Sequence, residues 1–394
     1  MREVAPLLSL AELHADLQRW LIEAACPLWQ ARGIDAIGGG FEETLDARAL
    51  PLHEARRARV QPRQVHAFAQ AARLGWSGDA AAIARRGMDY FVRVFRRKDG
   101  LFRTVASAHG APLDDRALLY DQAFALLGFC AAAGTPQPLR GDEIHALQLR
   151  AEIDRQFGTT GGGFISEAGA PNERESNPHM HLLEAYISWA QQDGSDPSWQ
   201  RCASDLVALA LDRMLLKDTG AICENYSPSW LPVTEGAGRR SEPGHQYEWA
   251  WLLMRSDRRH DPRCLAAALR LIEIAETRGL RDGYVVNALN ADFTVLDARA
   301  RLWPQTERIK ATALAAHSTG AAEYLHKARQ AAENLSHYLR TSIPGLWFDM
   351  RLASGEFVRS ASPASSFYHL VSAIASLDEA LKPVHSMRPS SGPT

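Results

Sequence analysis

The chain has 394 residues, of which 46% are hydrophobic and 23% charged, and its formal net charge is −2. This balance is typical of a soluble globular protein, argues against nucleic acid or an anionic membrane surface as a partner, and includes no apolar run near the roughly 18 residues that cross a bilayer. The five cysteines are scattered and form no CxxC pair, which predicts a reducing, cytoplasmic compartment and argues against a zinc cage.

The first predicted element is a helix that begins after Ser9. Ser9 and Glu12 have the spacing of a capping box, and Leu10, Leu17 and Leu21 recur near one helical face. Acidic residues interrupt the apolar run that a secretory signal peptide would need. The segment is therefore predicted to belong to the folded protein.

Along the rest of the chain, Ala- and Leu-rich helical stretches alternate with short glycine-led segments. The helical stretches are HAFAQAARL, DQAFALLGFCAAA, MHLLEAYISWA, YEWAWLLMRS, IKATALAAH and FYHLVSAIASLDEAL. The glycines that lead the short segments are Gly40, Gly100, Gly163, Gly220, Gly283 and Gly345. They lie 57 to 63 residues apart, and so even a period indicates six repeats.

Each repeat holds a glycine-turned, β-hairpin-like loop followed by two helices. Six such helical hairpins can close into an inner and an outer ring of helices. The predicted fold is therefore all-α, an (α/α)6 barrel with the loops at the mouth of the active site. An open solenoid is the alternative, although solenoid repeats are usually shorter and more uniform. One such domain is predicted over residues 1–382, and the Pro/Ser-rich tail 383–394 is predicted to be disordered.

One proline in each repeat falls just before a predicted helix. Proline is favoured in the first helical turn, where its missing N–H would have no partner. These prolines are Pro62, Pro112, Pro178, Pro243, Pro304 and Pro363. They predict that one helix of each repeat begins at a common mouth, with its positive dipole end directed there.

Polar, titratable residues follow most of these prolines at similar places, 18 to 25 residues after the repeat glycine. They are Arg63, His181, His245, Glu307 and His369. A purely structural repeat would have apolar residues there, so we expect these side chains to form one site. Further candidates share a helical face with them, namely His66, Asn177, Glu248 and Trp303.

Taken singly, each of these histidines is more often a core or surface residue than a catalyst. Their recurrence in three repeats is what favours a site. The pair His179 and His181 resembles a metal motif, but residues two apart on a helix point in different directions, so no metal site is predicted. No cofactor is predicted either, because neither glycine-rich GGGF segment matches a nucleotide-binding motif.

Histidine suits proton transfer near neutral pH. Two imidazoles on opposite sides of a bound sugar could remove and return the C2 proton through a cis-enediol or enediolate, while Arg63 and the helix N-termini stabilise the charge on oxygen. Reprotonation of C2 from the other face gives the 2-epimer, and protonation of C1 gives the ketose. Aromatic residues near the predicted site suit a sugar ring.

Five motifs resemble those of the N-acylglucosamine 2-epimerase superfamily, namely RQVHAFA, NPHMHLLEA, PGHQYEWAWLL, LWPQTE and SSFYHL. The resemblance runs from about residue 15 to 382. This group includes mannose isomerases, cellobiose and mannose 2-epimerases and a sulfosugar isomerase, all on (α/α)6 barrels. The resemblance implies that His245 and His369 are the acid/base pair, that His181 is a further active-site histidine and that Arg63 binds oxygens near C1 and C2. The residues that it implies contact the sugar or orient the histidines are Asn177, Glu248, Trp303 and Glu307.

His66 stands where isomerase members of the superfamily often have histidine and epimerases often have an aromatic residue. The stretch before PGH does not clearly supply the arginine associated with the sulfosugar enzyme, which favours a neutral aldose. We therefore predict a metal-independent sugar isomerase, monomeric or homodimeric, that first of all converts mannose to fructose. The close alternative is 2-epimerisation of N-acylglucosamine, mannose or a β-linked disaccharide.

Two other classes remain open from the sequence. The same barrel hosts glycoside hydrolases, and Glu248 with Glu307 could supply a carboxylate pair for glycosidic cleavage. A non-catalytic sugar-binding protein is the third reading, although aromatic residues without titratable partners would favour it more. The missing signal peptide and the histidine register count against the hydrolase.

Overall fold

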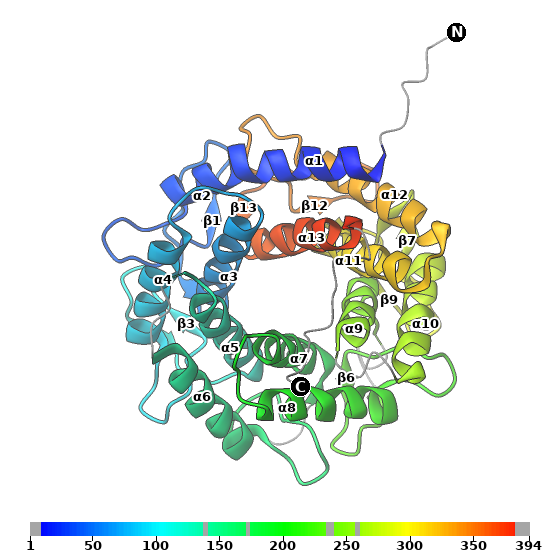
Figure 1. The fold of residues 1–394 in the computed structure, drawn as a ribbon, viewed down its shortest axis with the longest axis horizontal. Helices are drawn as coiled ribbons and strands as arrows, with labels where there is room; N and C mark the ends of the chain where they lie inside the picture. The colour runs from blue at the N-terminus through cyan, green and yellow to red at the C-terminus, as the bar shows by residue number, and fades with distance from the viewer. Residues whose placement is uncertain (1–8, 137–140, 171–173, 234–239, 257–260, 383–394) are drawn as a thin grey trace, which may run out of the picture.

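Two concentric layers of helices make up the part of the chain that the structure describes (Figure 1). In this computed structural model, that part comprises residues 9–136, 141–170, 174–233, 240–256 and 261–382, so the predicted disordered tail 383–394 lies outside the described residues. The inner helices are α3 (Val60–Arg73), α5 (Leu119–Ala133), α7 (Ser176–Ala190), α9 (Pro243–Arg255), α11 (Leu302–Thr319) and α13 (Ser365–Leu381).

The outer layer sheathes this ring, each helix packing on the inner helix that precedes it in the chain. The outer helices are α1 (Leu10–Trp20), α2 (Cys26–Arg32), α4 (Ala80–Phe95), α6 (Gly141–Phe157), α8 (Ser198–Leu209), α10 (Pro262–Arg278) and α12 (Ala322–Tyr338). The π-helical turn Leu21–Ala25 joins α1 to α2, and a second one, Ala210–Met214, extends α8. The exceptions in chain order are α1 and α2, which precede every inner helix. Of these, α1 covers α13 and α12, and Trp29 of α2 stacks on Phe367 of α13, so the two ends of the barrel sequence lie together.

The inner ring is closed. Each inner helix contacts the next one in the order α3, α5, α7, α9, α11 and α13, and α13 packs back on α3. This closure confirms the (α/α)6 barrel and excludes the open solenoid. No helix among the described residues is long and apolar enough to cross a membrane.

The two layers differ in how far their helices are buried. Almost every residue of α5 from Leu119 to Ala132 is buried, as expected of a helix that is apolar all round. By contrast, α4 buries one face that includes Ile83, Phe91 and Phe95. The first helix begins as predicted, because Ser9 and Glu12 form both hydrogen bonds of a capping box.

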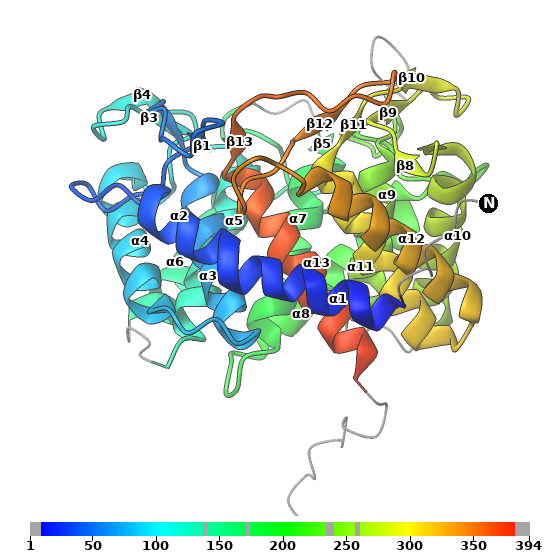
Figure 2. The ribbon, with the colours of Figure 1, turned by 90° about the horizontal axis from the view of Figure 1, so that it is seen from above.

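The predicted glycine-led loops are six small hairpins at one end of the barrel (Figure 2). In each, a backbone bridge or strand pair flanks the turn, as between Arg96 and Phe102 and between Leu215 and Ile222. The turns need a left-handed residue, which glycine supplies without strain, as Gly100 and Gly220 do at φ +88° and +77°. In the first repeat this residue is Gly39 rather than the predicted Gly40.

A side chain from the inner-helix side holds each hairpin by its backbone. In the second repeat, Gln122 Oε1 accepts from Phe102 N–H at 2.9 Å, and Nε2 donates to the carbonyl of the same residue at 2.9 Å. The residues that take this place in the other repeats are Gln61, His179, Gln246, Gln305 and Ser362. We call these six side chains the hairpin clamps. They satisfy buried backbone groups that the short strands leave unpaired.

Short strands then connect neighbouring hairpins around the rim. The strands are β1 (Thr44–Leu45), β2 (Arg56–Arg57), β3 (Val105–Ala106), β4 (Pro112–Asp114), β5 (Arg174–Glu175), β6 (Asn225–Tyr226), β7 (Leu280–Arg281), β8 (Tyr284–Val285), β9 (Ala288–Leu289), β10 (Val295–Asp297), β11 (Ala300–Arg301), β12 (Met350–Arg351) and β13 (Ser362–Pro363). Antiparallel pairs of β2 with β3, β5 with β6, and β11 with β12 link successive repeats, and β1 with β13 links the first repeat to the last.

The proline rule holds for most of the inner helices. Pro243 is the first residue of α9, and three others lie in the first turn of their helices. Pro363 lies in β13, just before α13 begins at Ser365. The prediction for Pro112 was wrong, because Pro112 lies on the exposed strand β4 and α5 begins only at Leu119. An exposed strand tolerates proline because its outward N–H positions need no partner.

Candidate active site

The hairpin end of the barrel encloses a cavity of about 680 Å³. The first turns of the inner helices and the hairpins form its wall. Most of the predicted site residues line it, namely Arg63, Asn177, His181, His245, Glu248, Trp303 and His369. Glu307 lies buried directly behind His369, and His66 lies elsewhere.

His245 stands on the first turn of α9, and its motif PGH has a structural explanation. Pro243 begins the helix. A side chain at Gly244 would meet the Trp303 ring at 2.5 Å, so only glycine lets that indole lie against α9. The Trp303 ring centroid is then 5.0 Å from that of His245 and 5.6 Å from that of His369. The indole thus lies close to both histidines.

The partner of His245 is Glu224, which the sequence analysis missed. Nδ1 of His245 lies 2.8 Å from Glu224 Oε2, whereas Glu248, which we expected in this role, lies instead beside His181. Burial alone would lower the pKa of His245, but the carboxylates of Glu224 and Glu242 raise the pKa to about 9. The imidazole is therefore a cation at neutral pH.

His369 has the opposite electrostatic character. Nδ1 of His369 lies 2.8 Å from Glu307 Oε1, yet burial outweighs this contact and lowers the pKa of the imidazole to about 4. The positive charges of Arg63 and Lys310 act in the same direction. At neutral pH His369 is thus uncharged. Because the Glu307 carboxylate accepts the Nδ1 proton, Nε2 is left as a free base.

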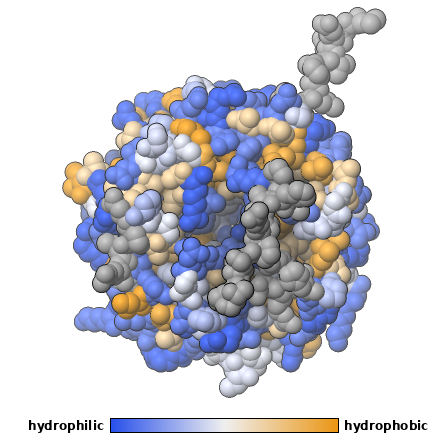
Figure 3. Space-filling view, viewed as in Figure 1, coloured by the Kyte–Doolittle hydropathy of each residue, from blue (hydrophilic) through white to orange (hydrophobic). Residues whose placement is uncertain are grey.

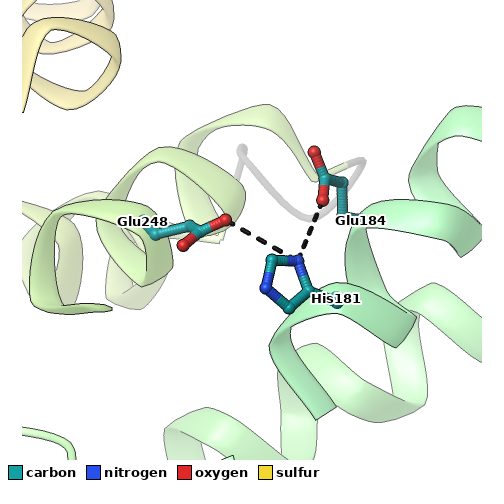
Figure 4. Close-up of side chains that lie close together, drawn as sticks. All are labelled: His181, Glu184 and Glu248. Atoms are coloured by element: carbon teal, nitrogen blue, oxygen red, sulfur yellow. Dashed lines mark hydrogen bonds and ion pairs between the residues drawn. The ribbon is translucent and has the colours of Figure 1, made fainter. Parts of the chain in front are cut away.

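His181 is held in a third, similar way, on α7 (Figure 4). Its Nδ1 lies 3.2 Å from Glu184 Oε2 and 3.7 Å from Glu248 Oε1. Burial lowers the pKa of His181 to about 4, although Glu184 raises it. The hydroxyl of Tyr368 donates to Glu184 from the other side. All three histidines are therefore fixed through Nδ1, and Nε2 is the nitrogen available to a ligand.

The trio of His181, Glu184 and Glu248 also has donor atoms within 4.8 Å of one another. It is the one such group among the described residues that is close enough to hold a metal ion. However, Lys310 and the Tyr368 hydroxyl already act on these carboxylates. An ammonium and a hydroxyl donor offset much of the negative charge that would attract a cation.

Arg63 provides positive charge to the floor of the cavity. Its side chain is buried, donates to the Tyr120 hydroxyl at 2.6 Å and stacks on the Phe124 ring at 3.9 Å. Among the described residues it forms no ion pair with a carboxylate, and its Nε–H has no hydrogen-bond partner. The guanidinium is therefore free to stabilise a negative oxygen of a ligand.

Four more arginines stand around the rim of the cavity, and each is paired with a carboxylate. Arg57 lies 2.7 Å from Glu43, and Arg59 lies 3.2 Å from Asp121. Arg240 and Arg301 share the single carboxylate of Glu242, at 2.7 and 3.1 Å. The rim is thus rich in guanidinium groups whose charge is largely balanced.

His66 does not join the other predicted residues. It lines a second cavity of about 380 Å³ formed by the C-terminal halves of inner helices. Figure 3 shows that end of the barrel, whose surface is largely hydrophilic. Burial lowers the pKa of His66 to about 4, and its ring lies 5.4 Å from that of Tyr368. Glu184 separates the two cavities, since it lines the second one while its carboxylate contacts His181.

Comparison with known proteins places the chain in a family of sugar isomerases and epimerases. The family model of N-acylglucosamine 2-epimerase (GlcNAc 2-epimerase) matches residues 39–373. A mannose-6-phosphate isomerase from Rhizobium meliloti is 42% identical over 377 residues, which cover 93% of this chain and 97% of that protein. A cellobiose 2-epimerase from Bacteroides fragilis is 23% identical, covering 89% of this chain and 94% of that one.

Two solved structures share the fold. The crystal structure of a D-mannose isomerase has a TM-score of 0.84 at 21% identity, covering 94% of this chain and 98% of that one. A cellobiose 2-epimerase from Bacillus thermoamylovorans has a TM-score of 0.83 at 18% identity, covering 94% of this chain and all of the other.

Proposed function

Because the chain belongs to the N-acylglucosamine 2-epimerase family, whose members here are sugar isomerases and epimerases, we propose that it converts mannose to fructose by aldose–ketose isomerisation. The observation that carries this proposal is the contrast between two histidines that both lie close to Trp303. His245 has a pKa of about 9 and His369 one of about 4. At neutral pH one is an acid and the other a base, which is what moving a proton between neighbouring carbons requires.

In the proposed reaction, Nε2 of His369 removes the C2 proton of the open-chain aldose. The electron pair of the C2–H bond forms the C1–C2 double bond, the carbonyl π pair moves to O1, and His245 donates a proton to O1. A cis-enediol results, and Arg63 stabilises the negative charge on oxygen during the step. His245 then takes the proton of O2 as the C2 carbonyl forms, and His369 returns its proton to C1.

The other site residues have supporting roles in this proposal. His181 handles ring opening or contacts a hydroxyl, and Asn177 and Trp303 bind the sugar. Glu307 and Glu248 act through the histidines beside them. For Glu307 this follows from its position, because its oxygens are engaged by His369 and Lys310 and its side chain is fully buried. A carboxylate so engaged is poorly placed for glycosidic cleavage, which disfavours the hydrolase reading.

A second candidate substrate is mannose 6-phosphate. Arg240 and Arg301 both pair with the carboxylate of Glu242, so two guanidinium groups lie close together at this part of the rim. Guanidinium groups bind phosphate through paired hydrogen bonds. The relative that is 42% identical is named for this substrate. We keep the neutral sugar first because the other rim arginines are each balanced by a carboxylate of their own.

The test is product analysis by NMR in D2O with D-mannose, D-mannose 6-phosphate, N-acetylglucosamine and cellobiose as separate substrates. We expect a ketose that carries deuterium at C1. It should form faster from either D-mannose or D-mannose 6-phosphate than from the other sugars. The His369→Ala variant should lose at least about 10²-fold in kcat, the scale of general acid–base catalysis. A 2-epimer as the product would favour the epimerase alternative, and deuterium uptake by none of these sugars would overturn the proposal.

We also propose that the reaction needs no metal ion. Each candidate histidine is held through Nδ1 by a carboxylate, and the proton transfers proposed above use Nε2 without a Lewis acid. Activity should therefore survive dialysis against EDTA. Loss of activity that added Mn²⁺ or Zn²⁺ restores would point instead to the trio of His181, Glu184 and Glu248.

A further inference from the structure

A fully buried lysine lies beneath the cavity and takes no part in the mechanism above. Lys310 stands on α11 with 0% of its side chain exposed. Its Nζ lies 2.6 Å from Glu307 Oε2 and 3.9 Å from the centroid of the Trp251 ring. A buried ammonium group is costly unless a carboxylate or an aromatic face compensates it. Its retention at this position calls for a role beyond packing.

Lys310 acts on three buried carboxylates from three inner helices. They are Glu307 on its own helix, Glu248 on α9 and Glu184 on α7. Three anions with one cation would leave a large excess of negative charge in the interior. Burial first, and then Glu307, raise the pKa of Glu248 well above its usual range. Glu248 is therefore the neutral acid of the group.

Glu307, by contrast, is ionised. Burial would raise its pKa, but Lys310 and His369 lower it below its usual value. Its two oxygens have different partners, because Oε2 pairs with Lys310 and Oε1 with Nδ1 of His369 at 2.8 Å. Lys310, Glu307 and His369 thus form one line of contacts that runs from the barrel interior to the cavity.

We propose that Lys310 is a positioning residue of the isomerase reaction, which keeps Glu307 ionised so that Glu307 holds the His369 proton on Nδ1 and leaves Nε2 free as the base. The inference rests on the proposed function. Besides Glu307, the charged groups that act on His369 are Arg63 on α3 and Lys310 on α11, and both disfavour the imidazolium form. Removing the ammonium group leaves Glu307 uncompensated, so a proton on His369 or on Glu307 itself becomes more favourable. Either event removes the free base.

The experiment measures kcat/KM against pH for the wild type and the Lys310→Met variant. In the wild type the acid limb reflects protonation of His369, near pH 4. In the variant we expect the acid limb to move up by at least about one pH unit. The loss of kcat/KM should then be about twofold greater at pH 5, and about fivefold greater at pH 4, than the loss at pH 8. A merely structural role would lower kcat/KM by one factor at every pH. The matched control is Lys327→Met on the outer helix α12, which should leave the profile unchanged.

A second variant guards against misfolding of Lys310→Met. The double change Lys310→Met with Glu307→Gln removes both buried charges together, which cores often tolerate. If Lys310 acts through Glu307, the double variant has the same kcat/KM as Glu307→Gln alone. A further loss of tenfold or more in the double variant, or an acid limb that stays in place in Lys310→Met, would overturn the inference. An inactive wild type would instead overturn the proposed function.

Discussion

At the scale of single residues, the site depends on what lies behind each imidazole. Three histidines share one arrangement, Nδ1 against a carboxylate, yet their charge states differ. Burial keeps His369 uncharged, and Lys310 offsets the charge of its partner Glu307, whereas Glu224 outweighs burial and makes His245 a cation. The balance between burial and the charges around each histidine therefore decides which one is the acid and which one the base.

Replacing Glu224 with Gln tests this assignment. The amide keeps a hydrogen bond to Nδ1 but removes the charge, so burial lowers the pKa of His245 from about 9. As pH is raised, activity that needs a protonated His245 should then fall at a lower pH than in the wild type. We expect the basic limb of kcat/KM to move down by at least about one pH unit, because the charge that stabilises the imidazolium form is gone. One unit corresponds to a loss of about 1.4 kcal/mol in that stabilisation.

Glu356→Gln, at an exposed position in the sixth hairpin segment, is the matched control and should leave the profile in place. If Glu224→Gln loses activity equally at every pH, His245 does not act as the acid, and Glu224 only orients it.

The sequence predicted the histidines but only part of what surrounds them. Glu184 follows His181 by one helical turn, so their contact could be read from spacing. Glu224 stands in a glycine-led hairpin that seemed to serve only as a turn, and its contact with His245 depends on how that hairpin folds back. Lys310 lies in an apolar helical stretch, where a single lysine usually reaches solvent. Burial of that lysine is decided by ring closure, which no local pattern records.

At the scale of the elements, the hairpin clamps make the six repeats equivalent. Each clamp replaces the ladder hydrogen bonds that a strand of two residues is too short to provide. The second repeat, where the clamp is Gln122, has none of the three histidines, so it allows the clamp to be tested apart from the chemistry.

Gln122→Ala should lower the free energy of unfolding by about 2–4 kcal/mol, because it leaves the N–H and the carbonyl of Phe102 buried without partners. Urea unfolding followed by circular dichroism measures this. Gln148→Ala, at an exposed position on α6, is the control and should change stability by less than about 0.5 kcal/mol. Equal effects of the two changes would mean that the clamps contribute nothing to stability.

The clamps also explain His179, which resembles half of a metal motif with His181 in the sequence. Its Nε2 accepts from Phe164 N–H at 3.0 Å, and its Nδ1 contacts the carbonyl of Glu175 at 2.7 Å. His179 thus stands where four other repeats have glutamine. Four glutamines at equivalent places in the repeats were present in the sequence. Glutamine is common on helix surfaces, however, so these positions do not indicate a structural role until their partners are known.

At the scale of the whole molecule, buried histidines couple stability to pH. Burial lowers the pKa to about 4 in four of them, namely His66, His179, His181 and His369. Below pH 6.5 the unfolded chain binds protons that the folded chain does not, so stability falls as pH drops from 6.5 towards 4. His245 has the opposite sign. Its contribution is complete below pH 6.5 and is lost as pH rises through about 9.

We therefore expect the Tm to be highest near pH 7, to decline as pH rises towards 9 and to fall steeply below pH 6. Scanning calorimetry from pH 4.5 to 9.5 measures it. The His179→Gln variant installs the clamp residue of the other repeats without a titrating group, so its Tm should fall less on the acid side. An acid slope equal to that of the wild type would show that His179 does not contribute.

The barrel itself was the most predictable part of the molecule, because six glycine-led turns at an even period leave few arrangements other than a closed ring. The division into one domain over residues 1–382, and the state as monomer or homodimer, stay predictions. The sequence could not predict that His66 lies towards the end of the barrel opposite the hairpins. A helix that spans the barrel presents one face to two cavities, and spacing alone does not say which of them a residue meets.

The packing of α1 on α13 has a consequence for synthesis on the ribosome. Because α1 precedes α13 in the chain, α1 finds its inner partner only after α13 has been made, and α13 also brings His369 to Glu307. Until then, α1 and α3 keep apolar faces without cover, which is the condition under which chaperones bind nascent chains. The enzyme thus cannot acquire its base before its ring is complete, and chains released early should be inert and prone to aggregate.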